Sequence, residues 1–231
     1  MYQAGIIFDG DDTLWETSVF YKEAKQEFFN KMASLGFNQS EVQESFEKTD
    51  VANVARFGFT KKRFPTSMAE TYQNFCKQYG CEKEINIERK LKSIGNSVFQ
   101  RNPLLLDRAD YILEQLRPFY KLVLATKGDL EVQKSKIEHS GLKDCFHEIY
   151  ILDHKTDKEI RQVIIKSKLE VSKSWAVGNS LKSDIKPAMQ AGLKAIWIPH
   201  TETWAYENDT EPNSSNFYKV SSLSQILEIL L

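Results

Sequence analysis

Cysteine is scarce in this chain of 231 residues, and the three that occur, Cys76, Cys81 and Cys145, lack the paired spacing of a metal site. We therefore expect reduced thiols and a cytoplasmic protein. No run of about 18 apolar residues occurs, and no basic segment precedes an apolar stretch at the N-terminus, so we expect no membrane span. Charge of one sign is not in excess either, because a net charge of −1 provides no general attraction for nucleic acid or a membrane surface.

Several familiar catalytic motifs are also missing. The chain has no G-x-S-x-G, no phosphate-binding P-loop, no glycine-rich dinucleotide fingerprint and no H-E-x-x-H. These absences argue against a serine nucleophile, a P-loop nucleotidase, a dinucleotide enzyme and a zinc protease. The 41% hydrophobic residues are nevertheless enough for a core, in one large domain or in one domain with a smaller insertion.

Short apolar runs rich in Val, Ile and aromatic residues alternate with helical patterns. Runs of five to seven such residues, each ending at a polar or glycine-containing turn, are typical of strands buried in a parallel sheet. Single helices between them indicate βαβ units, so we expect an α/β fold with a doubly wound, Rossmann-like parallel sheet. The expected strands are 4–8, 120–126, 148–152, 174–179 and 193–199.

The stretch between the first and second of these runs has a different character, because it contains only helical patterns. Its first pattern places five apolar residues at helical spacing before Gly36, a good helix end. We expect a core formed by 1–15 and 100–231 and a helical insert formed by 16–99. The five residues are Phe20, Ala24, Phe28, Met32 and Leu35.

Polar residues follow the expected strands at the points where they end. In open α/β sheets, functional sites form beyond the carboxyl ends of the strands, so these residues should lie along one edge. Each residue type alone is common in turns and helix caps, but the combination is not. The set is Asp9, Asp11, Asp12, Thr126, Lys127, Gly128, Asp153, Lys155, Asn179 and Asp184.

This combination suits phosphoryl transfer. Carboxylate and amide oxygens from two turns suit Mg²⁺, which also takes substrate phosphate oxygens as ligands. A lysine can offset the charge of the phosphate, so that one aspartate attacks phosphorus and forms a covalent aspartyl phosphate. A second aspartate can protonate the leaving oxygen and later deprotonate the attacking water.

Four segments, FDGDDTLW, LATKGD, HKTDKEIRQVI and VGNSLKSDIKPAMQAGLKAIWIP, resemble the signature motifs of the haloacid dehalogenase-like (HAD) hydrolase superfamily. The helical insert resembles that family's C1-type cap. The resemblance implies a phosphatase with Asp9 as nucleophile and metal ligand and Asp11 as general acid/base, its carbonyl also on the metal. It further implies that Thr126, the backbone N–H of Lys127, and Lys155 hold the phosphoryl group, while Asn179 and Asp184 complete the Mg²⁺ site.

The chain departs from the family pattern at two positions. Asp12 stands where glycine is more common, and we interpret it as a turn and helix-start residue. Asn179 stands where an aspartate is usual, so we expect weaker Mg²⁺ affinity than an Asn179→Asp variant would show. Lys158 is a rival of Lys155 for the basic role, although Lys155 is closer to the strand end.

Several readings of function stay open from the sequence. A Mg²⁺-dependent phosphomonoester hydrolase acting on a small phosphorylated metabolite comes first. The alternatives are a phosphomutase or a 2-haloacid dehalogenase of the same superfamily, or a phosphoacceptor signalling module.

Two further segments are candidates for lining a substrate site. They are the basic stretch 55–72, with Arg56, Lys61, Lys62 and Arg63, and the loop 199–207, with His200 and Trp204. The natural substrate and the oligomeric state do not follow from the sequence.

Overall fold

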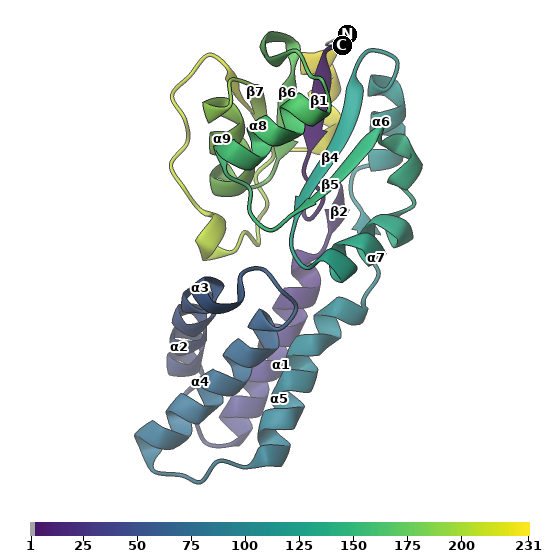
Figure 1. Cartoon of the computed structure of the whole chain (residues 1–231). Coiled ribbons are helices and arrows are strands. Elements are labelled where there is room, and N and C mark those ends of the chain that lie inside the picture. Colours follow the sequence, from purple (N-terminus) through teal and green to yellow (C-terminus); the bar gives the residue numbers. More distant parts are fainter. Residues whose placement is uncertain (1–2) are drawn as a thin grey trace. The chain divides into compact units, whose positions relative to one another are not determined.

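A computed structural model describes residues 3–231 of the protein, and the chain in it forms two compact units (Figure 1). The core unit comprises the residues up to Ser18 together with Asn102–Leu231. The helical unit comprises Val19–Arg101. From the sequence we expect these divisions between residues 15 and 16 and between residues 99 and 100.

The core unit is built on a six-stranded sheet with the strand order β5-β4-β1-β6-β7-β8. All neighbouring strands in this sheet are parallel, which confirms the expected doubly wound α/β fold. The strands are β1 (Gly5–Phe8), β4 (Lys121–Lys127), β5 (Glu148–Leu152), β6 (Trp175–Gly178), β7 (Lys194–Trp197) and β8 (Phe217–Lys219).

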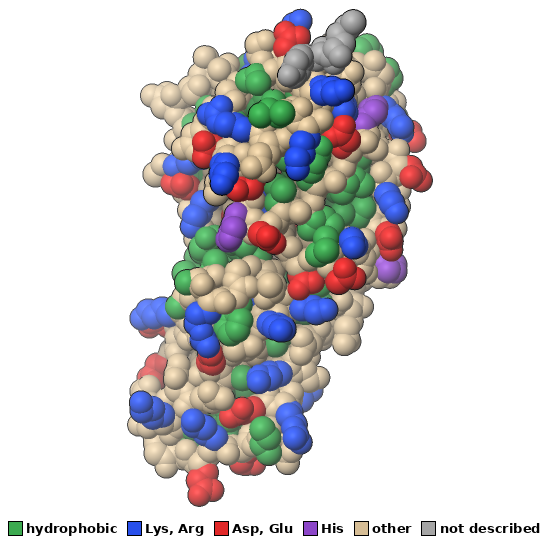
Figure 2. Space-filling view, in the orientation of Figure 1, with side chains coloured by type: hydrophobic (Ala, Val, Ile, Leu, Met, Phe, Trp, Pro, Cys, Tyr) green, Lys and Arg blue, Asp and Glu red, His purple; other side chains and the backbone are tan. Residues whose placement is uncertain are grey.

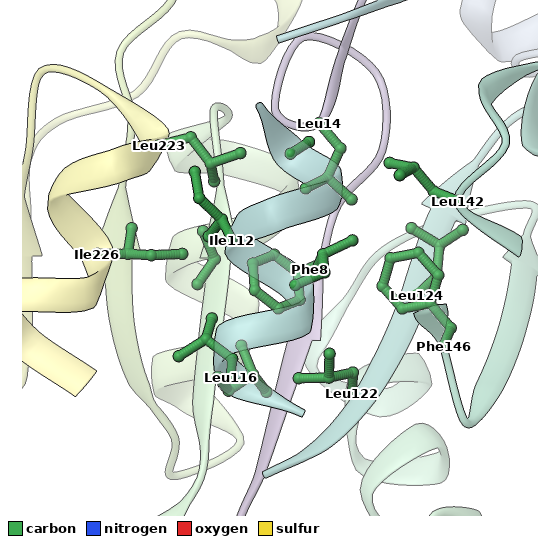
Figure 3. Close-up of a cluster of buried hydrophobic side chains, with 14 of the residues drawn as sticks. Phe8, Leu14, Ile112, Leu116, Leu122, Leu124, Leu142, Phe146, Leu223 and Ile226 are labelled. Atoms are coloured by element: carbon green, nitrogen blue, oxygen red, sulfur yellow. The ribbon is translucent and has the colours of Figure 1, made fainter. Parts of the chain in front are cut away.

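Helices cover both faces of this sheet because both faces of its strands are apolar. Alternate side chains of a strand point to opposite faces, so Phe8 belongs to one hydrophobic cluster and Ile7 to another. The cluster around Phe8 is packed by α6 and α10 (Figure 3), and the cluster around Ile7 is packed by α8 and α9. The helices of the core unit are α6 (Ala109–Leu116), α7 (Leu130–Ser140), α8 (Asp157–Lys166), α9 (Lys186–Gln190) and α10 (Ile226–Leu230).

The register of the three central strands determines which residues share the carboxyl edge of the sheet. Phe8 at the end of β1 pairs with Leu124 on one side and with Val177 on the other. The residues that follow Phe8, Leu124 and Val177 therefore emerge at one edge. Asp9 follows Phe8 directly, and Thr126 lies two residues beyond Leu124.

The helical unit has no strand among its residues 19–101, all of which are described, and its core is rich in aromatic rings. Four of the five apolar residues predicted for the first helix are buried, and Leu35 packs against them. The helical segment over residues 39–57 is interrupted at Asn53, whose buried side chain donates to Ser67 Oγ and Glu70 Oε2 of α4. The helices are α1 (Ser18–Ser34), α2 (Gln39–Ala52), α3 (Val54–Phe57), α4 (Arg63–Tyr79) and α5 (Ile85–Ser97).

Three short strands of the core unit were not expected from the sequence. β2 (Trp15–Glu16) pairs antiparallel with β3 (Leu104–Leu105), and β8 adds an edge to the main sheet. Strands of two or three residues are too short to show a hydrophobic period, so only the tertiary pairing reveals them. Within residues 3–231, no helix combines the length and apolar character needed to cross a lipid bilayer. Figure 2 shows acidic and basic side chains interspersed over the visible face.

Candidate active site

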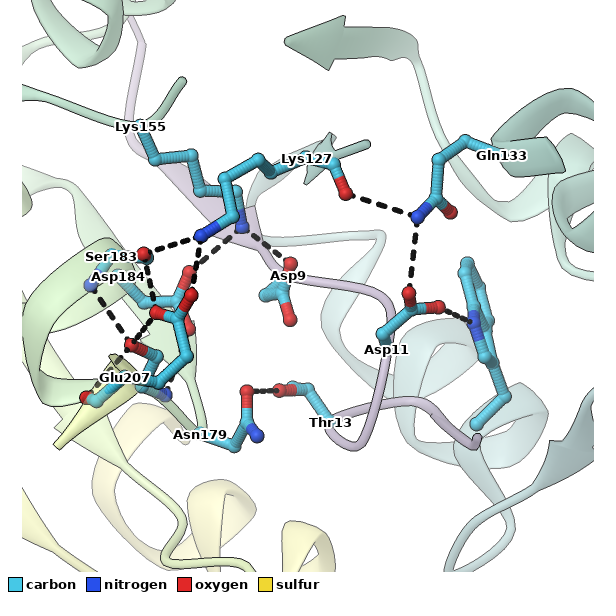
Figure 4. Close-up of polar contacts among 12 residues, drawn as sticks. Asp9, Asp11, Thr13, Lys127, Gln133, Lys155, Asn179, Ser183, Asp184 and Glu207 are labelled. Atoms are coloured by element: carbon cyan, nitrogen blue, oxygen red, sulfur yellow. Dashed lines mark hydrogen bonds and ion pairs between the residues drawn. The ribbon is translucent and has the colours of Figure 1, made fainter. Parts of the chain in front are cut away.

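An ammonium is buried between two carboxylates at the carboxyl edge of the sheet. Lys155, in the connection from β5 to α8, donates through Nζ to Asp9 Oδ1 and, at 2.7 Å, to Asp184 Oδ1 (Figure 4). The backbone N–H of Asp9 donates to Val177 O at 2.9 Å, which continues the β1–β6 pairing to the aspartate itself. The structure thus brings together residues that lie up to 175 positions apart, 184 minus 9.

The charges of this group do not balance. Burial and the neighbouring Asp184 raise the pKa of Asp9 to about 7, against the lowering effect of Lys155. Burial alone would lower the pKa of Lys155, but the two carboxylates outweigh it and raise that pKa. Two buried carboxylates that share one ammonium leave an excess of negative charge, which a further cation would offset.

Asp184 is positioned by a tight turn after β6. It lies in a π-helical segment, Leu181–Ile185, and its Oδ2 accepts from the backbone N–H of Ser180 at 2.9 Å. A Cβ atom at Gly178 would lie 2.5 Å from the Asp184 side chain, so only glycine leaves room for the carboxylate here. The sequence did not single out Gly178, because its importance depends on a contact that only the folded turn creates.

The third expected metal ligand of the edge also lies after β6. Asn179 Oδ1 accepts a long, 3.5 Å hydrogen bond from Thr13 Oγ1, and the Asn179 carbonyl accepts from Trp197 Nε1 at 2.7 Å. Asp9, Asn179 and Asp184 lie beyond the ends of two adjacent strands, β1 and β6, and Figure 4 shows the three side chains close to one another. Oxygen donors with surplus negative charge are a donor set that fits Mg²⁺.

A different group of possible ligands is formed by Asp12, Glu16 and His200, whose ligand atoms lie within 4.8 Å of one another. Here Asp12 already accepts from the backbone N–H groups of Thr17 and Ser18, at 2.8 and 2.9 Å. These bonds satisfy the first donors of α1, so the expectation that Asp12 is a turn and helix-start residue is confirmed. His200 Nε2 lies 2.9 Å from Glu16 Oε2.

The carboxylate of Asp11 is held by a separate set of donors. Trp15 Nε1 binds Oδ1 at 2.7 Å, while Gln133 Nε2 and Lys136 Nζ bind Oδ2 at 3.0 and 2.6 Å. Burial would raise the pKa of Asp11, but Lys136 and the other donors outweigh it and lower that pKa. Figure 4 shows the carboxylate turned toward Gln133, away from Asp9. Sequence reasoning missed these three donors, of which two lie on α7, beyond the strand ends.

The phosphate-binding candidates after β4 differ in their partners. Thr126 is buried, and its Oγ1 has no hydrogen-bond partner among residues 3–231. A buried hydroxyl without a partner is uncommon in folded proteins and suits a site that receives a ligand. The side chain of Lys127 donates to Ser183 Oγ at 2.7 Å and to Glu207 Oε1 at 2.6 Å, so its ammonium is paired with a carboxylate that the sequence did not highlight.

The remaining basic candidates lie in other settings. Lys158, the rival of Lys155, is exposed on α8. Arg56 forms an ion pair with Glu70 at 2.7 Å, and the buried Arg63 pairs with Asp50. These two arginines of the basic stretch therefore have carboxylate partners within the helical unit. In the loop 199–207, the ring of Trp204 stacks on that of Tyr206, with centroids 4.9 Å apart.

Comparison with known proteins identifies the family. The model of the haloacid dehalogenase-like hydrolases matches residues 6–198, which include every residue of the group around Lys155. This chain belongs to that family. Its membership confirms the resemblance and makes the protein a hydrolase, whereas the C1 subtype of the helical unit stays a prediction.

Individual relatives carry phosphatase names. The chain is 25% identical over 230 residues to the glyceraldehyde 3-phosphate phosphatase of Methanothermobacter thermautotrophicus, covering 97% of this chain and 98% of that protein. It is 28% identical over 133 residues to mouse N-acylneuraminate-9-phosphatase, covering 55% and 52%. A solved haloacid dehalogenase-like hydrolase from Xanthomonas campestris superimposes with a TM-score of 0.81 at 26% identity, covering 99% and 96%.

Proposed function

We propose that the protein is a Mg²⁺-dependent phosphomonoester hydrolase that acts through a covalent phosphoryl group on Asp9. The observation that carries the proposal is the buried group in which Lys155 bridges Asp9 and Asp184. In this proposal Asp9 of the group is the nucleophile, Lys155 is the cationic side chain that holds the phosphoryl group, and the surplus negative charge favours a metal ion. The phosphatase names of two relatives support the same chemistry.

The residues divide the first half of the reaction between them. An Asp9 carboxylate oxygen attacks phosphorus, a bond forms between that oxygen and phosphorus, and the bond from phosphorus to the ester oxygen breaks. Thr126 Oγ and Lys155 Nζ hold the phosphoryl oxygens, and Asp11 gives its proton to the departing oxygen. Mg²⁺, held by Asp9, the Asp11 carbonyl, Asn179 and Asp184, supplies charge neutralisation for the phosphoryl group when bound.

In the second half, the Asp11 carboxylate accepts a proton from water while the water oxygen attacks phosphorus. The Asp9–phosphorus bond breaks, and inorganic phosphate and free Asp9 result. The three hydrogen bonds from Trp15, Gln133 and Lys136 favour the ionised Asp11 that this half requires. For the acid role in the first half, the Asp11 carboxylate must turn away from Lys136 and take up a proton.

We further propose that the helical unit is a C1-type cap and that it selects a small phosphorylated metabolite as substrate. It is inserted between β1 and β4, the position at which the motifs predict such a cap. A phosphomutase would use the same edge, so turnover with water as acceptor is the property that distinguishes the proposed hydrolase. A dehalogenase is disfavoured because departure of a halide needs no proton from Asp11.

The decisive experiment is steady-state phosphate release from p-nitrophenyl phosphate, with Mg²⁺ or with EDTA, for the native protein and Asp9→Asn. We expect turnover only with Mg²⁺ and a decrease of about 10⁴-fold or more in Asp9→Asn, as for loss of an enzymic nucleophile. Asp144→Asn, which neutralises an exposed carboxylate of the core unit, is the matched control and should keep native turnover. Native turnover in Asp9→Asn, or none in the native protein, would contradict the proposal.

A further inference from the structure

Glu207 has an unusual position for a loop carboxylate. It lies in a short helical turn, Ala205–Glu207, within the long connection between β7 and β8, yet its side chain is only 15% exposed. It also lies outside the four signature segments and outside the residues 6–198 that the family model matches. A largely buried carboxylate requires partners, and those of Glu207 indicate what it does.

Three donors from two other segments converge on this carboxylate. Lys127 Nζ binds Oε1 at 2.6 Å, and the hydroxyls of Ser180 and Ser183 bind Oε2 at 2.7 and 2.5 Å. Lys127 also donates to Ser183 Oγ at 2.7 Å, so the lysine, the serine and the glutamate close a ring of hydrogen bonds. Glu207 thus ties the end of β4 and the turn after β6 to its own loop (Figure 4).

The two serines are the residues that position Asp184. Ser180 donates its backbone N–H to Asp184 Oδ2, and its hydroxyl accepts from the backbone N–H of Ser183 at 2.9 Å. Ser183 directly precedes Asp184 in the chain. Without the Glu207 carboxylate, both hydroxyls would lose the acceptor at Oε2, and the turn that bears Asp184 would lose its side-chain tie to the loop.

Glu207 also affects the local charge. The ammonium of Lys127 reaches the turn that holds Asp184, and Glu207 is the carboxylate that neutralises it there. If that carboxylate were absent, the positive charge of Lys127 would lose this counter-charge beside the turn and would weaken the binding of a cation to Asp184. Both effects act in the same direction, against binding of a divalent cation.

We propose that Glu207 is a positioning residue that increases the affinity of the Asp184 turn for a divalent cation, an inference that rests on the proposed function. Partners of metal-binding residues commonly change metal affinity by about 10- to 100-fold when they are removed. The loop between β7 and β8 would therefore contribute to the site through Glu207 without touching substrate.

The test is the dissociation constant for Mg²⁺ alone, measured by isothermal titration calorimetry on the full chain. We expect Glu207→Gln to weaken binding by about 10- to 100-fold. The matched control is Glu148→Gln. Glu148 also accepts hydrogen bonds from three side chains, those of Lys121, Ser167 and Tyr150, at 2.5 to 2.6 Å. It is the first residue of β5 and therefore lies at the amino ends of the strands, opposite the carboxyl edge that bears Asp184. This control should bind Mg²⁺ as the native protein does.

A second readout separates positioning from general stability. With p-nitrophenyl phosphate, the Mg²⁺ concentration for half-maximal activity should rise in Glu207→Gln by the same factor, while kcat at saturating Mg²⁺ stays within about threefold of native. Unchanged Mg²⁺ affinity in a folded Glu207→Gln would overturn the inference. If that variant does not fold, Ser183→Ala decides, with an expected weakening of about tenfold.

The outcomes also separate this inference from the proposed function. A native protein that neither binds Mg²⁺ nor releases phosphate would refute both. A native protein that does both, with a Glu207→Gln variant that binds Mg²⁺ equally well, would refute only the role of Glu207.

Discussion

The two units of the molecule each contain a buried ion-pair group, and the two groups differ in charge balance. In the core unit, Lys155 is shared by Asp9 and Asp184, whereas in the helical unit Arg63 pairs with Asp50. All five side chains are 10% exposed or less. The two groups are therefore buried to a similar degree. The Arg63 pair has one cation for one anion, whereas the Lys155 group has one cation for two anions.

This difference separates a pair that holds the fold from a group that is suited to a ligand. The guanidinium of Arg63 contacts both the carboxylate and the backbone carbonyl of Asp50, so it joins the start of α4 to α2 and neutralises its partner. The group around Lys155 keeps surplus negative charge, and burial together with Asp184 raises the pKa of Asp9 to about 7. Such an imbalance reduces the stability of the metal-free protein and favours a bound cation.

The largest expected effect comes from breaking the balanced pair. Arg63→Met should lower the free energy of unfolding by about 3–5 kcal/mol, because it leaves the Asp50 carboxylate buried without its cation. Arg56→Met is the control in the same unit, and loss of its pair with Glu70, in which Arg56 is 58% exposed, should cost less than about 1 kcal/mol. Urea unfolding followed by circular dichroism measures both. Equal losses would show that burial of the Arg63 pair is energetically irrelevant.

The second prediction converts the unbalanced group into a balanced one. At pH 8 in EDTA, Asp9→Asn should be more stable than the native protein by about 2 kcal/mol, because Lys155 then faces one carboxylate only. Saturating Mg²⁺ should stabilise the native protein more than the variant, since a ligand that binds the folded state raises its stability. Urea unfolding with and without Mg²⁺ provides the values. If Asp9→Asn is less stable than the native protein in EDTA, the group around Lys155 does not carry the destabilising excess of negative charge that we infer.

The third prediction increases the imbalance. Asn179→Asp should bind Mg²⁺ about tenfold more tightly than the native protein, because a carboxylate adds one negative charge to the same donor set. In EDTA the same variant should be less stable than native for the same reason. Calorimetric titration with Mg²⁺ and urea unfolding in EDTA test the two parts. Equal or weaker Mg²⁺ binding by the variant would remove Asn179 from the site.

The smallest expected effect concerns Glu148, whose ion pair lies far from the imbalance. Burial would raise its pKa, but Lys121, Ser167 and Tyr150 outweigh it and lower the pKa from 4.5 to about 2. A lowered pKa contributes stability above the unfolded value, which is lost as the pH falls from about 4.5 toward 2. Glu148→Gln should therefore cost about 1 kcal/mol at pH 7 and progressively less below pH 4. Urea unfolding of the native protein and of Glu148→Gln at several pH values measures this loss. A difference in stability that does not change with pH would contradict the prediction.

The main elements of the fold could be predicted from the sequence because their signals are local. The five apolar runs became β1, β4, β5, β6 and β7 in the expected parallel sheet. Buried parallel strands are continuous apolar segments, so each run can be recognised without knowledge of its partners. The break at Asn53 and the edge strand β8 escaped prediction because both depend on residues distant in the chain, Ser67 and Glu70 in one case and β7 in the other.

The candidate site could be predicted only where its residues lie in the segments that immediately follow strands. Asp9, Lys155 and Asp184 were expected at one edge, and the structure brings them into contact. The partners of Asp11 on α7 do not follow a strand end and therefore have no such signal. The same is true of Glu207, the partner of Lys127 in the connection between β7 and β8. Gln133, Lys136 and Glu207 are ordinary polar residues of a helix and a loop until the fold directs them toward the edge.

The sequence by itself determined the order of strands and helices, the polar residues at the strand ends and the family pattern that they form. These features depend on residue type and spacing along the chain, which folding does not alter. Only the tertiary structure decided that Lys155 bridges two carboxylates, that Asp11 is turned toward α7 and that Glu207 accepts hydrogen bonds from the turn bearing Asp184. Charge balance and hydrogen bonding depend on distance in space, and the pairing of the strands brings together groups that are far apart along the chain.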